Sequence, residues 1–290
     1  PVLGGAVAAA FLALIKSRVI YQDDKIAAAK KWVPILVGIM AGAFASYLAL
    51  KGLKRIMKID LPTALAIGLA LGVVAWLVTI PLIRKQAEGL ENRNRSLKVL
   101  FGIPLVISAA LLSFAHGAND VANAVGPLAA IVHAAEFGSF SAKVAIPMWV
   151  MVIGAFGISF GLFLFGPKLI RMVGSQITKL NPMRAYCVSL SAAITVIIAS
   201  WLGLPVSSTH IAVGAVFGVG FYREWDAARR MKANAEAMPP ENRIAPEERR
   251  RRKLVRRSHF MTIIAAWVIT VPAAAVMSAV IFFILNTIVV

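Results

Sequence analysis

Long uninterrupted runs of apolar residues constrain this chain more than any other feature. Hydrophobic residues make up 59% of the sequence and charged residues only 15%, whereas soluble domains are about half apolar and about a quarter charged. Five runs without a formal charge approach or exceed the length that a helix needs to cross a bilayer, about 20 residues. They cover residues 1–15, 32–50, 61–83, 144–167 and 260–290. The sequence therefore predicts an all-α polytopic membrane protein and argues against a soluble globular fold.

Two further apolar blocks are too long for one ordinary span. Residues 99–135 and 185–222 contain 37 and 38 residues, and either block would be about 55 Å long as one straight helix. Each is also slightly short for two full spans and a turn. We therefore expect broken helices or re-entrant hairpins in both blocks. Irregular backbone inside a membrane is tolerated where it is buried in protein or lines a wet cavity, so the breaks are where function is expected.

The basic residues predict the orientation of these segments. The formal net charge is +18, and all 31 Lys and Arg residues lie between the apolar segments. If block 99–135 crosses once and block 185–222 returns to its starting side, 26 of these 31 residues collect on one side. The positive-inside rule makes that side cytoplasmic, which places the basic loop 223–259 in the cytoplasm and the C-terminus outside. No aromatic residues alternate with the arginines of this loop, so nucleic acid is not a predicted partner.

The first polar break runs from residue 116 to residue 127. Asp120 is the only acidic residue in block 99–135, and a carboxylate inside a membrane is costly unless it has a partner or a function. Asn119 and Asn123 share a helix face, and carboxylate and amide oxygens together suit a hard cation such as sodium. Asp120 alone could instead carry a proton or only hold helices together. Two glycines allow close backbone approach and are predicted to shape this break: Gly117 and Gly126.

The second polar break lies between residues 203 and 210. Pro205 can break or begin a helix, and three hydroxyl residues then open the next apolar run: Ser207, Ser208 and Thr209. Hydroxyl side chains cap the free N–H groups of a helix start, and such a start also binds anions such as phosphate. No Lys or Arg lies within this break, so a bound anion would need a co-bound cation, which Asp120 could hold. The alternative is a plain helix cap.

The histidines are assigned supporting roles. We expect His210 to form supporting hydrogen bonds, although a proton carrier or an ordinary packed histidine is also possible. His116 and His133 are expected to be structural or interfacial. The spacing of these residues matches no common zinc pattern, so no metal centre is predicted. No nucleophile–base pair stands out, so no catalytic residue and no enzyme activity are predicted.

The residues of both breaks resemble the inorganic phosphate transporter (PiT) family. Residues 117–124 read Gly-Ala-Asn-Asp-Val-Ala-Asn-Ala, residues 205–210 read Pro-Val-Ser-Ser-Thr-His, and the closing segment 265–272 is also similar. The resemblance implies a secondary transporter of the plasma (inner) membrane that moves inorganic phosphate with a coupling cation, sodium or a proton. It also implies two inverted repeats that bind phosphate between them. On the matching positions it assigns phosphate contacts to Asn119, Asp120, Ser207, Ser208 and Thr209, and the coupling cation to Asn119, Asp120 and Asn123.

Each family element occurs once here, whereas the resemblance implies two copies. The chain therefore resembles the C-terminal repeat and the central region, one half of an inverted-repeat transporter, and we expect a C-terminal fragment. The other half of the site would come from a missing N-terminal repeat or from a second chain. Alternatives are a structural or assembly subunit without transport activity and a carrier of a different anion. The expected organisation is central-region helices in 1–98, transport-core helices in 99–222, the basic loop 223–259 and a membrane helix in 260–290.

Overall fold

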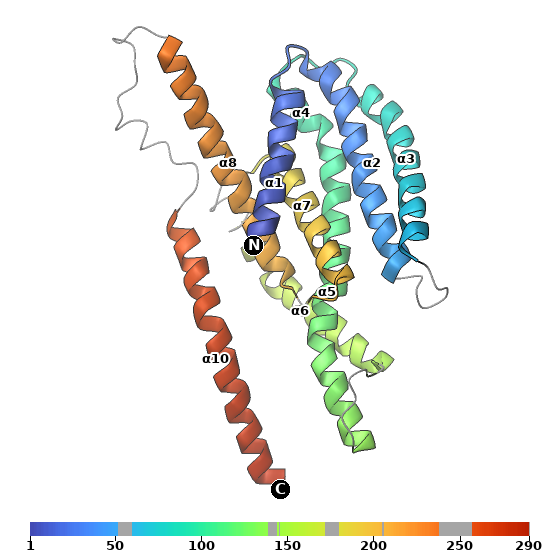
Figure 1. The fold of residues 1–290 in the computed structure, drawn as a ribbon, viewed down its shortest axis with the longest axis vertical. Helices are drawn as coiled ribbons and strands as arrows, with labels where there is room; N and C mark the ends of the chain where they lie inside the picture. Colours follow the sequence, from blue (N-terminus) through green and yellow to red (C-terminus); the bar gives the residue numbers. More distant parts are fainter. Residues whose placement is uncertain are drawn as a thin grey trace.

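The regular structure of the chain is helical (Figure 1). The computed structural model describes residues 1–51, 60–138, 144, 146–171, 180–204, 206–237 and 257–289. Within these ranges there is no strand, and seven helical segments are long and apolar enough to cross a membrane. These findings confirm the predicted all-α polytopic fold. The elements are α1 (Val2–Ile15), the π-helical turn η1 (Lys16–Ile20), α2 (Lys25–Lys51), α3 (Leu61–Gln86), α4 (Asn94–Leu100), α5 (Gly102–Phe137), α6 (Met148–Arg171), α7 (Pro182–Trp201), α8 (Ser208–Ala237) and α10 (Arg257–Val289).

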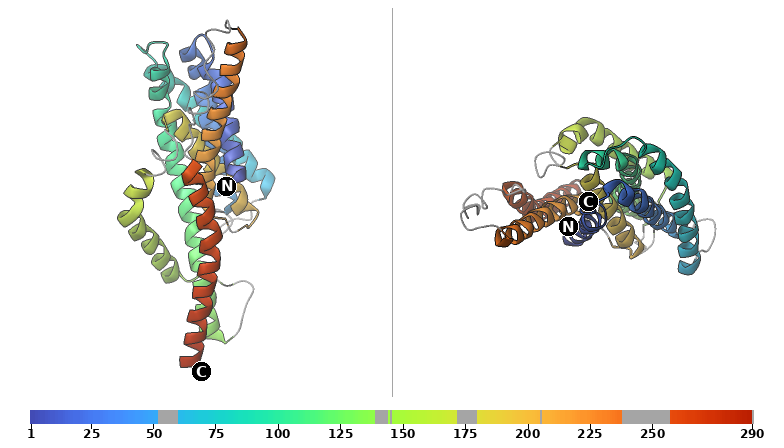
Figure 2. Two further views of the ribbon diagram at one scale, coloured as in Figure 1. Left: turned by 90° about the vertical axis from the view of Figure 1, so that its left-hand side faces the viewer. Right: turned by 90° about the horizontal axis from the view of Figure 1, so that it is seen from above.

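The main core lies where α1, α2, α4, α7 and α8 meet. Leu12, Leu36, Leu97 and Tyr186 are among its fully buried side chains. Residues 1–98 and 99–222 therefore share one core. The C-terminal half of α5 and the C-terminal part of α10 extend beyond this bundle, as Figure 1 and the left view of Figure 2 show. Apolar side chains on α6 and α10 are largely exposed, as expected of helices that face lipid or another protein segment.

Glycines bring two pairs of helices into close contact. On α2 and α3, an added Cβ at Gly72 would lie 2.9 Å from the carbonyl oxygen of Gly38, and one at Gly42 would lie 3.0 Å from that of Gly68. Similar close contacts between α1 and α8 involve Gly5 and Gly214. Membrane helices associate without a strong hydrophobic driving force between them, so small residues that allow backbones to pack closely matter more there.

The break predicted within residues 116–127 is absent. Helix α5 continues through this run as one 36-residue helix, with Pro127 inside it. The glycines with positive φ in the described ranges are Gly89, Gly138 and Gly203, so neither Gly117 nor Gly126 adopts a turn conformation. Proline removes one helical N–H donor, but neighbouring groups in a membrane protein can compensate for that loss. The predicted role of Gly117 and Gly126 in a helix break is therefore wrong.

The second apolar block is interrupted, as predicted. Helix α7 ends at Trp201, Gly203 adopts φ +73°, and α8 starts at Ser208. The N–H of Leu204 donates to the carbonyl of Ala199 at 2.9 Å, which satisfies a carbonyl at the end of α7, and left-handed glycines commonly end helices in this way. Pro205, which was predicted to shape this break, lies outside the described residues. Of the basic loop 223–259, residues 223–237 continue α8 and residues 238–256 also lie outside the described ranges.

Candidate functional site

The polar residues of the two predicted breaks meet where the start of α8 touches the middle of α5. The hydroxyl of Ser208 donates to Oδ1 of Asp120 at 2.8 Å and lies 2.7 Å from Nδ1 of His116. His116 Nε2 lies 3.1 Å from Oδ2 of Asp120. Ser208 is fully buried, whereas His116 and Asp120 are half-buried. The three side chains therefore form a closed set of contacts that joins two helices.

Asp120 has polar partners on both of its oxygens in this set. The Ser208 hydroxyl donates to Oδ1, and Nε2 of His116 lies beside Oδ2. Which ring nitrogen of His116 carries a proton depends on the tautomer. A carboxylate at this depth requires such partners.

Two amide side chains attach the connection between α7 and α8 to α5. Nδ2 of Asn119 donates to the carbonyl oxygen of Val206 at 2.7 Å and to Oδ1 of Asp120 at 3.0 Å. Nδ2 of Asn123 donates to the same carbonyl at 3.2 Å. Asn119 is buried and Asn123 is exposed. One turn of α5 thus holds the backbone that immediately precedes α8, and the spacing of four residues explains why both amides reach one atom.

Ser207 and Ser208 have different roles at the start of α8. The N–H of His210 donates to the Ser207 hydroxyl at 3.3 Å, and the N–H of Ile211 donates to the Ser207 carbonyl at 3.1 Å. Ser207 is therefore the N-cap residue, which agrees with the plain-cap alternative for this position. Ser208 instead points to Asp120. Thr209 is exposed and His210 is half-buried at the third position of the helix.

The site lies half-way along α5. Asn119 and Asp120 are the central pair of the 36 residues Gly102–Phe137, with about 27 Å of helix on each side of them. Helix α5 is one of the candidate spans, so its centre lies at the depth of the bilayer midplane if α5 crosses symmetrically. A helix N-terminus at that depth offers unpaired N–H groups and the positive end of a dipole to an anion.

Sequence reasoning missed the position of His116. It assigned His116 a structural or interfacial role, yet the structure places this side chain against both Asp120 and Ser208. The available signal was the spacing of four residues between His116 and Asp120, which puts both on one helix face. The close backbone approach predicted at Gly117 and Gly126 is also absent, because a Cβ added at either residue would meet no heavy atom within 4 Å.

Comparison with known proteins assigns the family. The sequence model of the phosphate transporter family matches residues 1–278. This chain belongs to the phosphate transporter family. The family consists of transporters, which confirms the predictions of a membrane transport protein and of no enzyme activity.

Several members of the phosphate transporter family are similar to this chain. A Helicobacter pylori protein named "Putative phosphate permease" is 53% identical over 227 residues, which cover 77% of this chain and 43% of that protein. The chloroplastic inorganic phosphate transporter 2-1 of Arabidopsis thaliana is 35% identical over 258 residues, which cover 79% of this chain and 43% of that protein. A solved structure titled "The sodium-dependent phosphate transporter" matches with a TM-score of 0.82 and 30% identity, covering 99% of this chain and 64% of that one. The chain thus spans about half the length of the curated relatives it matches.

Proposed function

We propose that this chain forms half of the substrate site of a phosphate symporter and that Asp120 holds the coupling cation. The observation that carries the proposal is the contact between Asp120 and the first residue of α8, Ser208. It brings a carboxylate, which can hold a cation, and a helix start, which can hold an anion, to one point at the centre of α5. Phosphate would contact Ser207, Ser208 and Thr209 together with Asn119, and the cation would contact Asp120, Asn119 and Asn123.

The placement of Asp120 explains why transport of the two ions would be coupled. Two like unit charges about 5 Å apart repel by about 3 kcal/mol at an effective dielectric constant of 20. Phosphate beside an unoccupied Asp120 would therefore bind more than a hundredfold more weakly than phosphate beside an Asp120 that holds a cation. Each ion then raises the affinity for the other by the same factor. Binding of both is the condition for alternating access, in which the repeats rock around the shared site.

Sodium is our proposed coupling ion. Carboxylate and amide oxygens of Asp120, Asn119 and Asn123 are hard ligands, and a structurally similar protein is described as sodium-dependent. A proton carried by Asp120 is the alternative. We further propose that an N-terminal repeat or a second chain completes the site, since the relatives are about twice as long as the matched segment. The protein would lie in the plasma (inner) membrane with 223–259 cytoplasmic and the C-terminus outside.

Uptake by proteoliposomes that contain the full-length gene product tests the proposal. Radiolabelled phosphate should accumulate when an inward sodium gradient is imposed and should accumulate little when potassium replaces sodium. Unlabelled sulfate should not compete. Uptake of sulfate but not of phosphate would overturn the assignment of phosphate as substrate. Phosphate uptake driven equally well by a proton gradient without sodium would overturn the assignment of sodium as coupling ion. No uptake of either anion would favour a structural or assembly subunit.

A further inference from the structure

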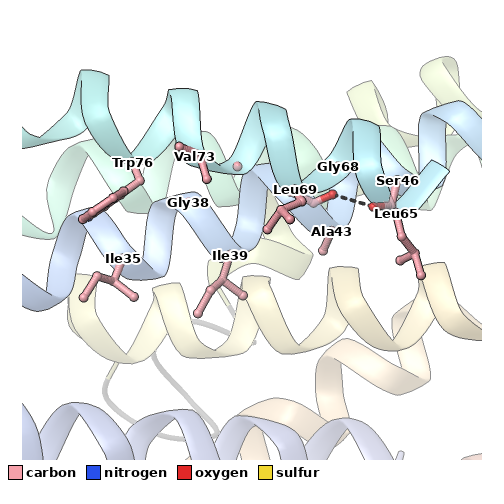
Figure 3. A pocket seen from close by; sticks show the side chains of 12 residues that line it. Ile35, Gly38, Ile39, Ala43, Ser46, Leu65, Gly68, Leu69, Val73 and Trp76 are labelled. Atoms are coloured by element: carbon pink, nitrogen blue, oxygen red, sulfur yellow. Dashed lines mark hydrogen bonds between the residues drawn. The ribbon is translucent and has the colours of Figure 1, made fainter. Parts of the chain in front are cut away.

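Away from the site on α5 and α8, one face of α2 lines two cavities. The first cavity, of about 500 Å³, lies beside the start of α2 and is lined by charged residues that include Arg18, Asp23, Asp24 and Lys31. The second, of about 550 Å³, is a groove between α2 and α3 (Figure 3). We call these the polar pocket and the apolar groove.

The polar pocket and the apolar groove follow one another along α2. Ala28 and Trp32 line the pocket, and Ile35, Ile39 and Ser46 line the groove. These positions recur at intervals of three, four or seven residues, which places them on a single helix face. A molecule with a polar end and an apolar tail could therefore occupy both cavities without leaving the surface of α2.

The apolar groove has the chemistry and the length of an acyl-chain site. Ile39 and Leu69 on its walls are 50% and 71% exposed. The hydroxyl of Ser46 donates to the carbonyl of Gly42 at 3.0 Å, so its one proton is used within α2. From Ile35 to Ser46 the groove is about 16 Å long, close to the depth of one leaflet, which is half of a hydrocarbon core of about 30 Å. Both α2 and α3 are candidate membrane spans, so in a membrane the open side of the groove would be within reach of lipid tails.

The charges of the polar pocket select the headgroup. Two cations, Arg18 and Lys31, and two carboxylates, Asp23 and Asp24, line it. A purely anionic headgroup would meet both carboxylates, whereas a headgroup that carries a phosphate and an ammonium has a partner for each sign. Trp32 lies below Arg18, with the guanidinium carbon 5.6 Å from the ring centroid, and tryptophan is typical of the membrane–water boundary. The pocket is thus at the level of lipid headgroups.

We propose that this face of α2 binds one phosphatidylethanolamine molecule. Its phosphate contacts Arg18 and Lys31, its ammonium contacts Asp23 and Asp24, and one acyl chain fills the groove between α2 and α3. This lipid site is separate from the transport site and does not depend on the proposed function.

Native mass spectrometry of the full-length protein in phosphatidylcholine nanodiscs, titrated with phosphatidylethanolamine or phosphatidylglycerol, tests this proposal. We expect one retained phosphatidylethanolamine per chain. Arg18→Gln or Lys31→Gln should weaken its retention about tenfold, since a charge-assisted contact is lost. The control is Lys30→Gln, which removes the same charge from the opposite face of α2 and should retain the lipid as the unsubstituted protein does.

A second pair of variants tests the groove. Ala43→Leu narrows it and should also reduce retention about tenfold, whereas Ala70→Leu adds the same volume to α3 away from the groove and should not. Thermal unfolding of all variants in phosphatidylcholine alone checks that they fold. Stronger retention of phosphatidylglycerol than of phosphatidylethanolamine would overturn the assigned headgroup. The proposed site would be overturned if the Lys30→Gln and Lys31→Gln variants retained the lipid equally, or if the Ala43→Leu and Ala70→Leu variants did.

Discussion

The hydroxyl of Ser208 lies 2.8 Å from Oδ1 of Asp120, although 88 residues separate them in sequence. Asp120 sits at the centre of α5, and Ser208 is the first residue of α8. A carboxylate at a helix N-terminus is favourable in itself, because the dipole attracts negative charge. The same N-terminus attracts phosphate, so the carboxylate and the phosphate compete for it unless a cation is present.

Substitution of Ser208 by alanine removes the hydroxyl that bridges Asp120 and His116. Hydrogen bonds to charged groups contribute about 1.5–3 kcal/mol, so we expect phosphate uptake to fall about 10- to 100-fold. Ser208→Thr keeps the hydroxyl and should restore most of the uptake. Ser207→Ala keeps the contact with Asp120 and removes an N-cap worth about 1 kcal/mol of stability together with a proposed phosphate contact, so comparing the two variants separates the bridge to Asp120 from the loss of a hydroxyl. Equal uptake by Ser208→Ala and the unsubstituted protein would contradict the assigned contact.

Asn119 and Asn123 donate to the same carbonyl, that of Val206, but from different environments. Asn119 is buried and bonds at 2.7 Å, whereas Asn123 is exposed and bonds at 3.2 Å. Asn119→Ala should therefore lower the free energy of unfolding by about 1–3 kcal/mol, because a buried amide loses its bonds to Val206 and Asp120, and Asn123→Ala by less than about 1 kcal/mol. Denaturation of both variants in detergent measures the difference. The reverse order would show that Asn123 has the greater part in attaching the connection to α5.

Asp226, which is buried on α8, pairs with residues in and just after η1. Its carboxylate accepts from Lys16 Nζ at 2.7 Å and from the Tyr21 hydroxyl at 2.5 Å, and Arg230 lies 3.6 Å away. Asp226→Asn leaves Lys16 without its charged partner, and breaking a buried pair in this way costs about 3 kcal/mol. Thermal unfolding of the full-length variant measures this loss. Replacing both partners, as in Lys16→Met with Asp226→Leu, should cost less than the single change.

Asp226 also makes the stability of the fold depend on pH. Burial alone raises the pKa of Asp226, but hydrogen bonds from Lys16 and Tyr21 and the charges of Lys16 and Arg230 outweigh it, so the pKa is lowered. The ionised carboxylate then stabilises the folded protein at any pH above the pKa of aspartate in the unfolded chain, about 3.9. This stabilisation is lost as the pH falls through the lower pKa of Asp226 in the folded protein. The unsubstituted protein should lose more stability than Asp226→Asn between pH 6 and pH 3. If the free energy of unfolding fell equally with pH in the two proteins, this account would be contradicted.

The crossing of α2 and α3 depends on glycine at position 72. An added Cβ there would lie 2.9 Å from the carbonyl oxygen of Gly38, a rigid backbone atom. We expect Gly72→Leu to destabilise the protein by at least about 1–3 kcal/mol, the usual cost of overpacking. Gly157→Leu is the matched control on α6, where a Cβ would meet no heavy atom within 4 Å. Similar unfolding temperatures for the two variants would show that the helices separate without cost.

Much of this fold follows from apolar runs, because a bilayer restricts which segments can cross it. The run 61–83, for example, corresponds to α3 (Leu61–Gln86). The pairing of Asp120 with the start of α8 also follows from chemistry, since a bound anion without Lys or Arg needs a cation. The continuity of α5 does not follow, because whether Pro127 interrupts a helix depends on neighbouring groups that the local sequence does not contain. The contact of His116 with Ser208 likewise depends on tertiary packing.

Sodium-dependent phosphate uptake by the Asp120→Asn variant tests the central claim most directly. Asparagine has nearly the same size as aspartate but no charge, so the fold should persist while the coupling cation loses its main ligand. Initial rates would be measured over a range of sodium concentrations in proteoliposomes, with Glu136→Gln, an exposed position near the end of α5, as the control. We predict that Asp120→Asn abolishes the stimulation by sodium and that Glu136→Gln retains it. Unchanged stimulation by sodium in Asp120→Asn would contradict the account.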